Sequence, residues 1–70
     1  LYEACMTGSL NIAQLMIDKG ANNFDESFHV TCLNNYYNIA KILYKRANNH
    51  SECKKIAQNN GFKRLLKLFN

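Results

Sequence analysis

Apolar side chains recur in this chain at helical spacing. In two segments they fall at positions i, i+1, i+3 and i+4, which form one stripe along an α-helix. These positions are Ile12, Ala13, Leu15 and Met16 in the first segment and Ile39, Ala40, Ile42 and Leu43 in the second. Strict alternation of apolar and polar residues, the mark of a half-buried strand, appears nowhere. The pattern therefore predicts an all-α fold without a β-sheet.

The two stripes belong to copies of one longer unit. A shift of 27 residues lays segment 4–20 on segment 31–47, and a further shift of 26 lays segment 30–43 on segment 56–69. Neither stripe can be buried within its own unit, whereas stacked neighbours bury it. The chain is therefore predicted to be one repeat domain, 1–70, with units of approximately 1–26, 27–51 and 52–70.

Each unit is predicted to hold two short helices. The first carries a small residue in its middle, which is Ala4, Thr31 or Ala57. Four residues later stands Gly8, Asn35 or Gly61, where a left-handed residue ends the helix at little cost. The second helix carries the apolar stripe. Helices are expected near 1–7, 10–19, 27–34, 37–46, 52–59 and 62–69.

The unit resembles the ankyrin repeat. Copy one carries the family's Ala-x-x-x-Gly as Ala4 to Gly8, then an apolar helix, then Gly20-Ala21-Asn22. In copy two, His29 alone matches the family's Thr-Pro-Leu-His motif. The period is shorter than the family's 33 residues, and the shortfall falls between Ala21 and Thr31, where ankyrin repeats have a β-hairpin. The resemblance implies a solenoid of stacked helix-turn-helix repeats with shortened β-hairpin connectors.

Length and composition narrow the picture further. Seventy residues make one domain at most, and a start at Leu1 with an end inside an apolar stretch suggests a fragment. The hydrophobic fraction of 47% argues against a disordered tail. Three cysteines without a visible signal peptide indicate reduced thiols and an intracellular location. Many Asn, Lys and Tyr residues agree with the short repeats of large DNA viruses, which would place the protein in an infected host cell.

Two His-x-x-Cys pairs offer a possible zinc site. They are His29 with Cys32 and His50 with Cys53, and residues three apart on a helix reach the same side. The alternative is that the thiols are small buried side chains. We favour it because Cys32 occupies the repeat position of Cys5, which has no histidine partner. We therefore expect no metal, and a zinc-stabilised domain remains the alternative.

No constellation points to catalysis. A Cys–His couple needs a third orienting group and a cleft with oxyanion donors, which short helix pairs do not enclose. The three glycines, Gly8, Gly20 and Gly61, each stand at a helix end rather than in a phosphate-binding loop. We therefore expect neither enzymatic activity, nor a cofactor, nor a small-molecule substrate.

Charge is distributed unevenly along the chain. Residues 1–40 carry one basic and four acidic side chains, and residues 41–70 carry eight basic and one acidic. A basic C-terminal face could bind an anionic membrane or nucleic acid, so this class of function is an alternative. We disfavour it because the interleaved apolar residues occupy the core positions of the repeat. The basic residues concerned are Lys54, Lys55, Lys63, Arg64 and Lys67.

The first helices and connectors form the candidate partner-binding surface. The resemblance implies docking at the positions two and three residues after each small residue. Two of these, Met6 and Leu33, would be exposed apolar residues, unless they pack between neighbouring copies. The candidate residues are Met6, Thr7, Phe24, Asp25, Leu33, Asn34, Asn59 and Asn60. The expected function is non-enzymatic binding of another protein, whose identity the sequence does not specify.

Overall fold

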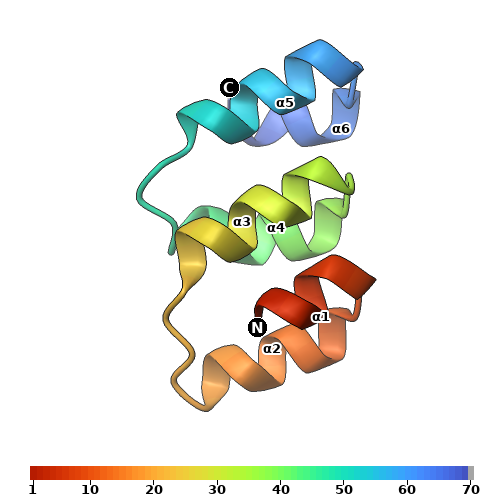
Figure 1. Ribbon diagram of the computed structural model, residues 1–70. Helices are drawn as coiled ribbons and strands as arrows, with labels where there is room; N and C mark the ends of the chain where they lie inside the picture. The colour runs from red at the N-terminus through yellow and green to blue at the C-terminus, as the bar shows by residue number, and fades with distance from the viewer. Residues whose placement is uncertain (70) are drawn as a thin grey trace.

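The computed structural model describes residues 1–69, and within that range it holds helices and no strand. The all-α prediction is therefore confirmed (Figure 1). The elements are α1 (Tyr2–Thr7), α2 (Leu10–Asp18), α3 (Phe24–Leu33), α4 (Tyr37–Tyr44), α5 (Ser51–Asn60), α6 (Lys63–Leu66) and the 3-10 turn η1 (Lys67–Phe69).

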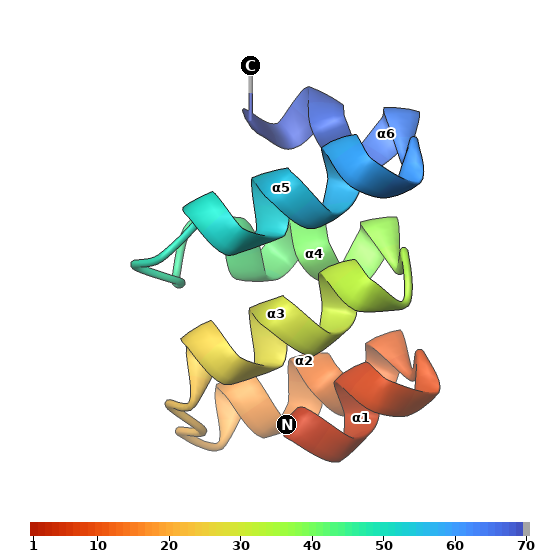
Figure 2. The same cartoon turned by 45° about the horizontal axis from the view of Figure 1, so that its top comes forward.

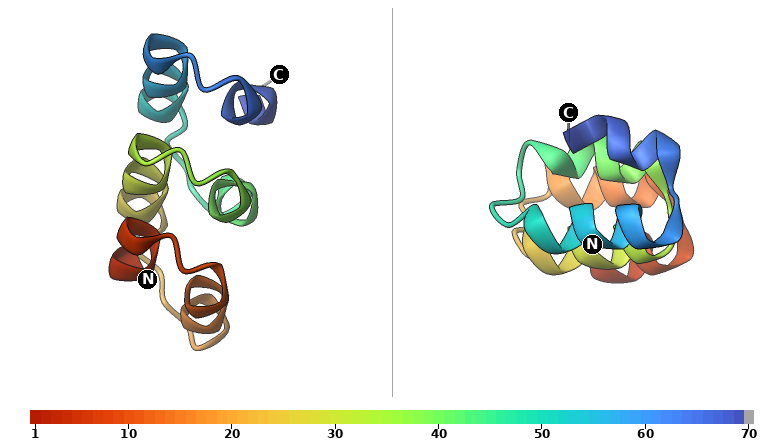
Figure 3. Two further views of the ribbon diagram at one scale, coloured as in Figure 1. Left: turned by 90° about the vertical axis from the view of Figure 1, so that its right-hand side faces the viewer. Right: turned by 90° about the horizontal axis from the view of Figure 1, so that it is seen from above.

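The helices pair into three hairpins that stack along one direction. The first helices of the hairpins, α1, α3 and α5, lie side by side (Figure 2). The second helices, α2, α4 and α6, form a separate layer behind them, as an end-on view shows (Figure 3, left). Each hairpin therefore touches its neighbours through both of its helices.

The turn inside each hairpin is the same in all three copies. Gly8, Asn35 and Gly61 have φ angles of 78°, 56° and 67°, in the left-handed region. In each copy the backbone N–H of the next residue donates to the carbonyl of the small residue of the first helix, at 3.0, 3.1 and 3.0 Å. The predicted helix ends are confirmed, and asparagine serves at the second turn because it tolerates this conformation.

Small residues line the seam between the hairpins. Thr31 and Ala57 are buried in the first helices of the second and third hairpins, and Ala13 and Ala40 are buried in the second helices of the first and second hairpins. Small side chains allow neighbouring helices to approach closely. The polar residues that follow the two alanines, Gln14 and Lys41, are exposed as the helical phase predicted.

Three boundaries differ from the prediction. Helix α3 begins at Phe24 rather than near 27, and its first turn contains Asp25 and Glu26, whose charges favour a helix N-terminus. Helix α4 ends at Tyr44. The last expected helix is one short α-helix, α6, followed by η1, so no continuous helix covers 62–69.

The connectors also differ from what the resemblance implied. Only residues 19–23 separate α2 from α3, and 45–50 separate α4 from α5. Neither connector contains a strand, so the shortened β-hairpin is absent from residues 1–69. The early start of α3 leaves too few residues in the first connector to pair two strands across a turn.

Candidate functional site

The exposed side chains of α1, α3 and α5 form what we call the helix-one surface. Met6 and Leu33 stand 27 residues apart at equivalent positions of neighbouring helices, and they are 50% and 51% exposed. They therefore do not pack between hairpins. Of the two alternatives that the sequence left open for these residues, exposure is the one that the structure has. We restrict the name to the exposed residues Tyr2, Met6, Thr7, Leu33, Asn34, Asn59 and Asn60.

Several polar members of this surface are bonded to their own helices. The side chains of Thr7, Asn34 and Asn60 each donate to the carbonyl four residues earlier, at 3.2, 3.0 and 2.8 Å. Thr7 and Asn34 directly follow Met6 and Leu33, and Asn60 follows Asn59, the equivalent position of α5. The three polar side chains therefore lie along one edge of the surface. The result is an apolar strip, formed by Tyr2, Met6 and Leu33, beside a row of fixed polar groups.

A hollow of about 450 Å³ lies between α1 and α3 on the same side of the molecule. It is lined by Tyr2 of α1 and by Asp25, Glu26 and His29 of α3. The sequence interpretation missed Tyr2, although it precedes Met6 by four residues and so shares its helix face. It also missed that Tyr2 and His29 stand at equivalent repeat positions and would meet across neighbouring helices.

Phe24 and Asp25, which were also expected to bind a partner, contact other parts of the fold. Oδ1 of Asp25 accepts the backbone N–H groups of Asn48 and Asn49, at 2.6 and 3.2 Å, and so ties the second connector to α3. Phe24 packs against the core, and the guanidinium of Arg46 lies 5.8 Å from the centroid of its ring. The expectation that both belong to a connector is wrong, because α3 includes them.

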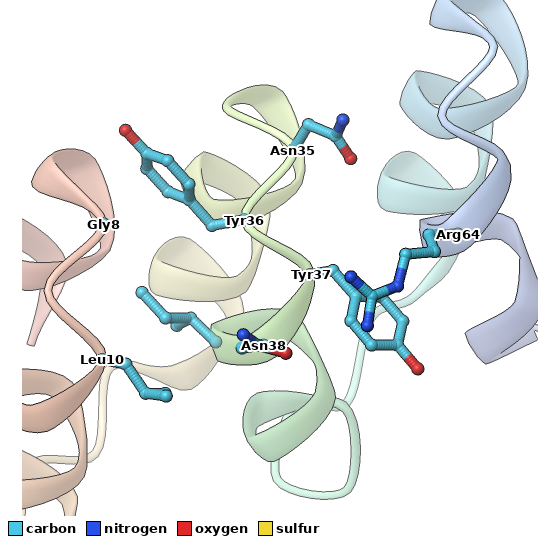
Figure 4. Close-up of a pocket in the computed structure, with 8 residues that line it drawn as sticks. Gly8, Leu10, Asn35, Tyr36, Tyr37, Asn38 and Arg64 are labelled. Carbon is cyan, nitrogen blue, oxygen red and sulfur yellow. The ribbon is translucent and has the colours of Figure 1, made fainter.

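A second hollow, of about 250 Å³, lies between the turns of the first two hairpins and Arg64 of α6 (Figure 4). Tyr36 points toward Gly8, where an added Cβ would lie 2.8 Å from Cζ of the ring. Arg64 crosses the ring of Tyr37, with its guanidinium carbon 4.1 Å from the centroid. These side chains link adjacent hairpins, so the lining of this hollow contributes to stacking.

Basic side chains line a third hollow, of about 690 Å³, on the layer of second helices. Lys41, Lys45 and Arg46 surround it together with Gln14 and Ile42. The cations singled out in the sequence lie instead on α5, α6 and η1, where all of them are exposed. The apolar residues between them are core residues, as expected: Leu65 is fully buried, and Leu66, Leu68 and Phe69 pack against the core.

The two His-x-x-Cys pairs meet through Cys32 and Cys53, which share a hydrogen bond, but their histidines have other neighbours. Nε2 of His50 lies 2.8 Å from the carbonyl oxygen of Tyr44, and its ring stacks on the Tyr44 ring with centroids 4.3 Å apart. His29 lines the hollow beside Tyr2, whereas Cys32 and Cys53 are buried. Within residues 1–69 no three His, Cys, Asp or Glu side chains form a group able to hold a metal ion.

The thiols occupy the seams between hairpins. Burial raises the pKa of Cys5 above the ordinary thiol value. A hydrogen bond to Cys53, together with burial, raises the pKa of Cys32, and the same bond lowers the pKa of Cys53. Cys5 and Cys32 therefore remain neutral thiols at pH 7, and a thiol is a poor nucleophile compared with a thiolate. Their interpretation as small buried side chains is confirmed.

Within residues 1–69, no helix has the length and the hydropathy that a membrane-spanning segment requires. Compared with known proteins, the chain matches no family model, and neither a curated protein nor a solved structure is similar enough to count as a match.

Proposed function

We propose that this chain is a non-enzymatic protein-interaction scaffold that docks another protein on the helix-one surface. In this proposal the three hairpins are ankyrin-like repeats, and their stack is a short solenoid. The repetition of one turn, with its left-handed residue and its hydrogen bond, supports the repeat assignment. The observation that carries the function is the exposed apolar strip of Tyr2, Met6 and Leu33.

The chemistry of the strip is that of a protein interface. Tyrosine and methionine are enriched in such interfaces, and burying an exposed apolar side chain contributes about 25 cal/mol per Å² of area removed from water. Thr7, Asn34 and Asn60 are fixed by hydrogen bonds to their helices. A partner would meet them at little entropic cost, because bonded side chains have less freedom to lose.

The hollow beside the strip indicates the charge of the partner. Asp25 and Glu26 line it beside Tyr2. An apolar anchor flanked by Lys or Arg would complement this region, since opposite charges favour encounter and orientation. We therefore propose a partner segment with apolar and basic side chains.

The proposal is tested by site-specific cross-linking. A photoreactive amino acid at position 6 or 33 should cross-link the partner in extracts of the source cells, whereas the same group at position 14 or 41 should not. The captured protein is then purified and titrated. We expect Met6→Ser and Leu33→Ser each to weaken its binding by about 5-fold or more, because central interface contacts are worth over about 1 kcal/mol.

Equal cross-linking at all four positions, or an unchanged Kd in both variants, would reject the helix-one surface. Salt dependence separates the alternative of nucleic-acid or membrane binding through the basic residues. A steep loss of affinity between about 50 and 200 mM salt is the signature of phosphate contacts. Binding through the apolar strip predicts a shallow dependence instead.

A further inference from the structure

The first hairpin leaves open a face that is covered in the other two. Ile12, Ile39 and Leu65 occupy the same position in the repeat, on α2, α4 and α6. Ile12 is 52% exposed, whereas Ile39 is 2% exposed and Leu65 is fully buried. The position therefore faces the preceding hairpin in the stack, and no hairpin covers it in the first unit.

The open face is a hollow with an apolar floor. Its volume is about 300 Å³, and Leu1, Ala4, Ile12 and Met16 line it together with Glu3 and Thr7. The four apolar residues correspond, after the shift of 27, to four residues of the second hairpin that are all buried. Those equivalents are Phe28, Thr31, Ile39 and Leu43.

The opposite end of the stack has a different character. Where α1 and α3 present the buried Cys5 and Cys32, α5 presents Gln58, which is exposed. Where α2 and α4 present the buried Ala13 and Ala40, α6 presents the larger Leu66. The outward side of the first hairpin thus has apolar residues at positions that are buried in an inner hairpin. The outward side of the third hairpin instead has a polar residue and a larger residue where the inner hairpins have a cysteine and an alanine.

We propose that the face formed by Leu1, Ala4, Ile12 and Met16 docks one further helical hairpin of the same pattern, joined in the same chain ahead of Leu1. The inference rests on the burial of the equivalent residues in the second and third hairpins. The incoming hairpin would present small side chains where α1 and α2 present Cys5 and Ala13 to their neighbour.

A second copy of the chain fits this face less well. Its third hairpin would offer Gln58 and Leu66 in place of a cysteine and an alanine, so a polar amide would be buried and the seam overfilled. If two copies met through their first hairpins, each would present Leu1, Ile12 and Met16 to the other. These side chains are bulky, whereas the seam between hairpins accepts small ones. We therefore assign the face to a hairpin in cis.

The test extends the chain at this end. A copy of residues 1–27 placed ahead of Leu1 reproduces the spacing with which the first hairpin meets the second. If it docks, the extended chain should unfold as one unit, at a higher urea midpoint and with a slope m about 1.4-fold larger, because m follows the surface exposed on unfolding. Ile12→Ser in the original copy should lower the midpoint strongly there and only slightly in the 70-residue chain.

Three outcomes would overturn the proposal. The first is an extended chain with the midpoint and slope of the original, and the second is a gain in midpoint that Ile12→Ser does not remove. The third is a dimer of the 70-residue chain in sedimentation that Ile12→Lys dissociates, which would show a second copy on this face. Exposed Gln14→Ser is the matched control and should shift the midpoint equally little in both chains.

Discussion

Helices α2 and α4 carry nearly the same apolar stripe and bury it to different extents. Ile39 and Leu43 of α4 are buried, whereas Ile12 of α2 is half exposed and Met16 is only partly buried. The internal alanines, Ala13 and Ala40, are fully buried in both helices. The comparison separates two positions of the stripe, one that faces the preceding hairpin and one, the alanine, that faces the following hairpin. A further member, Leu15, is 47% exposed, so the stripe is not buried along its whole width.

The largest expected effect separates these two helices directly. Ile39→Ala should lower the free energy of unfolding by about 2–5 kcal/mol, because it removes buried methyl groups and leaves a cavity. Ile12→Ala should cost less than about 1 kcal/mol, since Ile12 is half exposed. Urea denaturation of both variants measures the difference. Similar losses at the two positions would mean that Ile12 is covered in solution.

The alanines should behave alike in the two helices. Ala40→Leu and Ala13→Leu should each cost about 1–3 kcal/mol, because both alanines are fully buried and a larger side chain overfills the seam. The same change at the exposed neighbours Lys41 and Gln14 should cost under about 1 kcal/mol. Chemical denaturation of the four variants would show equal costs if the helical phase were wrong.

The turns of the first and third hairpins offer a narrower comparison. Gly8→Ala and Gly61→Ala both force a side chain into the left-handed region, at roughly 1–2 kcal/mol each. At Gly8 the new Cβ would also meet the Tyr36 ring, whereas nothing lies within 4 Å of it at Gly61. Gly8→Ala should therefore cost about 1 kcal/mol more, as thermal denaturation would measure. Combining it with Tyr36→Ala should abolish that excess.

The smallest expected effect concerns the second connector. Asp25→Ala removes the carboxylate that accepts the N–H groups of Asn48 and Asn49, and should cost about 0.5–1.5 kcal/mol. Hydrogen exchange of these two amides should accelerate. Glu26→Ala, at the exposed neighbour, should leave exchange unchanged. Equal acceleration in both variants would indicate a general loosening of α3 rather than the loss of this tie.

Much of the fold follows from short-range features of the sequence. The left-handed residues Gly8, Asn35 and Gly61 mark the turns, and the apolar stripe fixes which side of each second helix is buried. The start of α3 at Phe24 was not predicted, because the resemblance to longer repeats favoured a connector there. The break after Leu66 was also missed, since four apolar residues at helical spacing do not distinguish an α-helix from a 3-10 turn.

The candidate surface was partly visible in the sequence. The repeat places Met6 and Leu33 at equivalent positions, but only the packed hairpins decide that both are exposed. Tyr2 could have been added from its i, i+4 spacing to Met6. The role of Asp25 could not, because its hydrogen-bond donors lie 23 and 24 residues further along the chain.

By itself the sequence determined the helical class, the period of the repeat and the inward face of each helix, because these depend on residues a few positions apart. Only the tertiary structure decided which inward residues are covered. Burial depends on which hairpin lies beside another, and so equivalent side chains such as Ile12 and Ile39 end in different surroundings. The same dependence on neighbours separates the exposed strip from the core and makes the first face of the stack unlike the last.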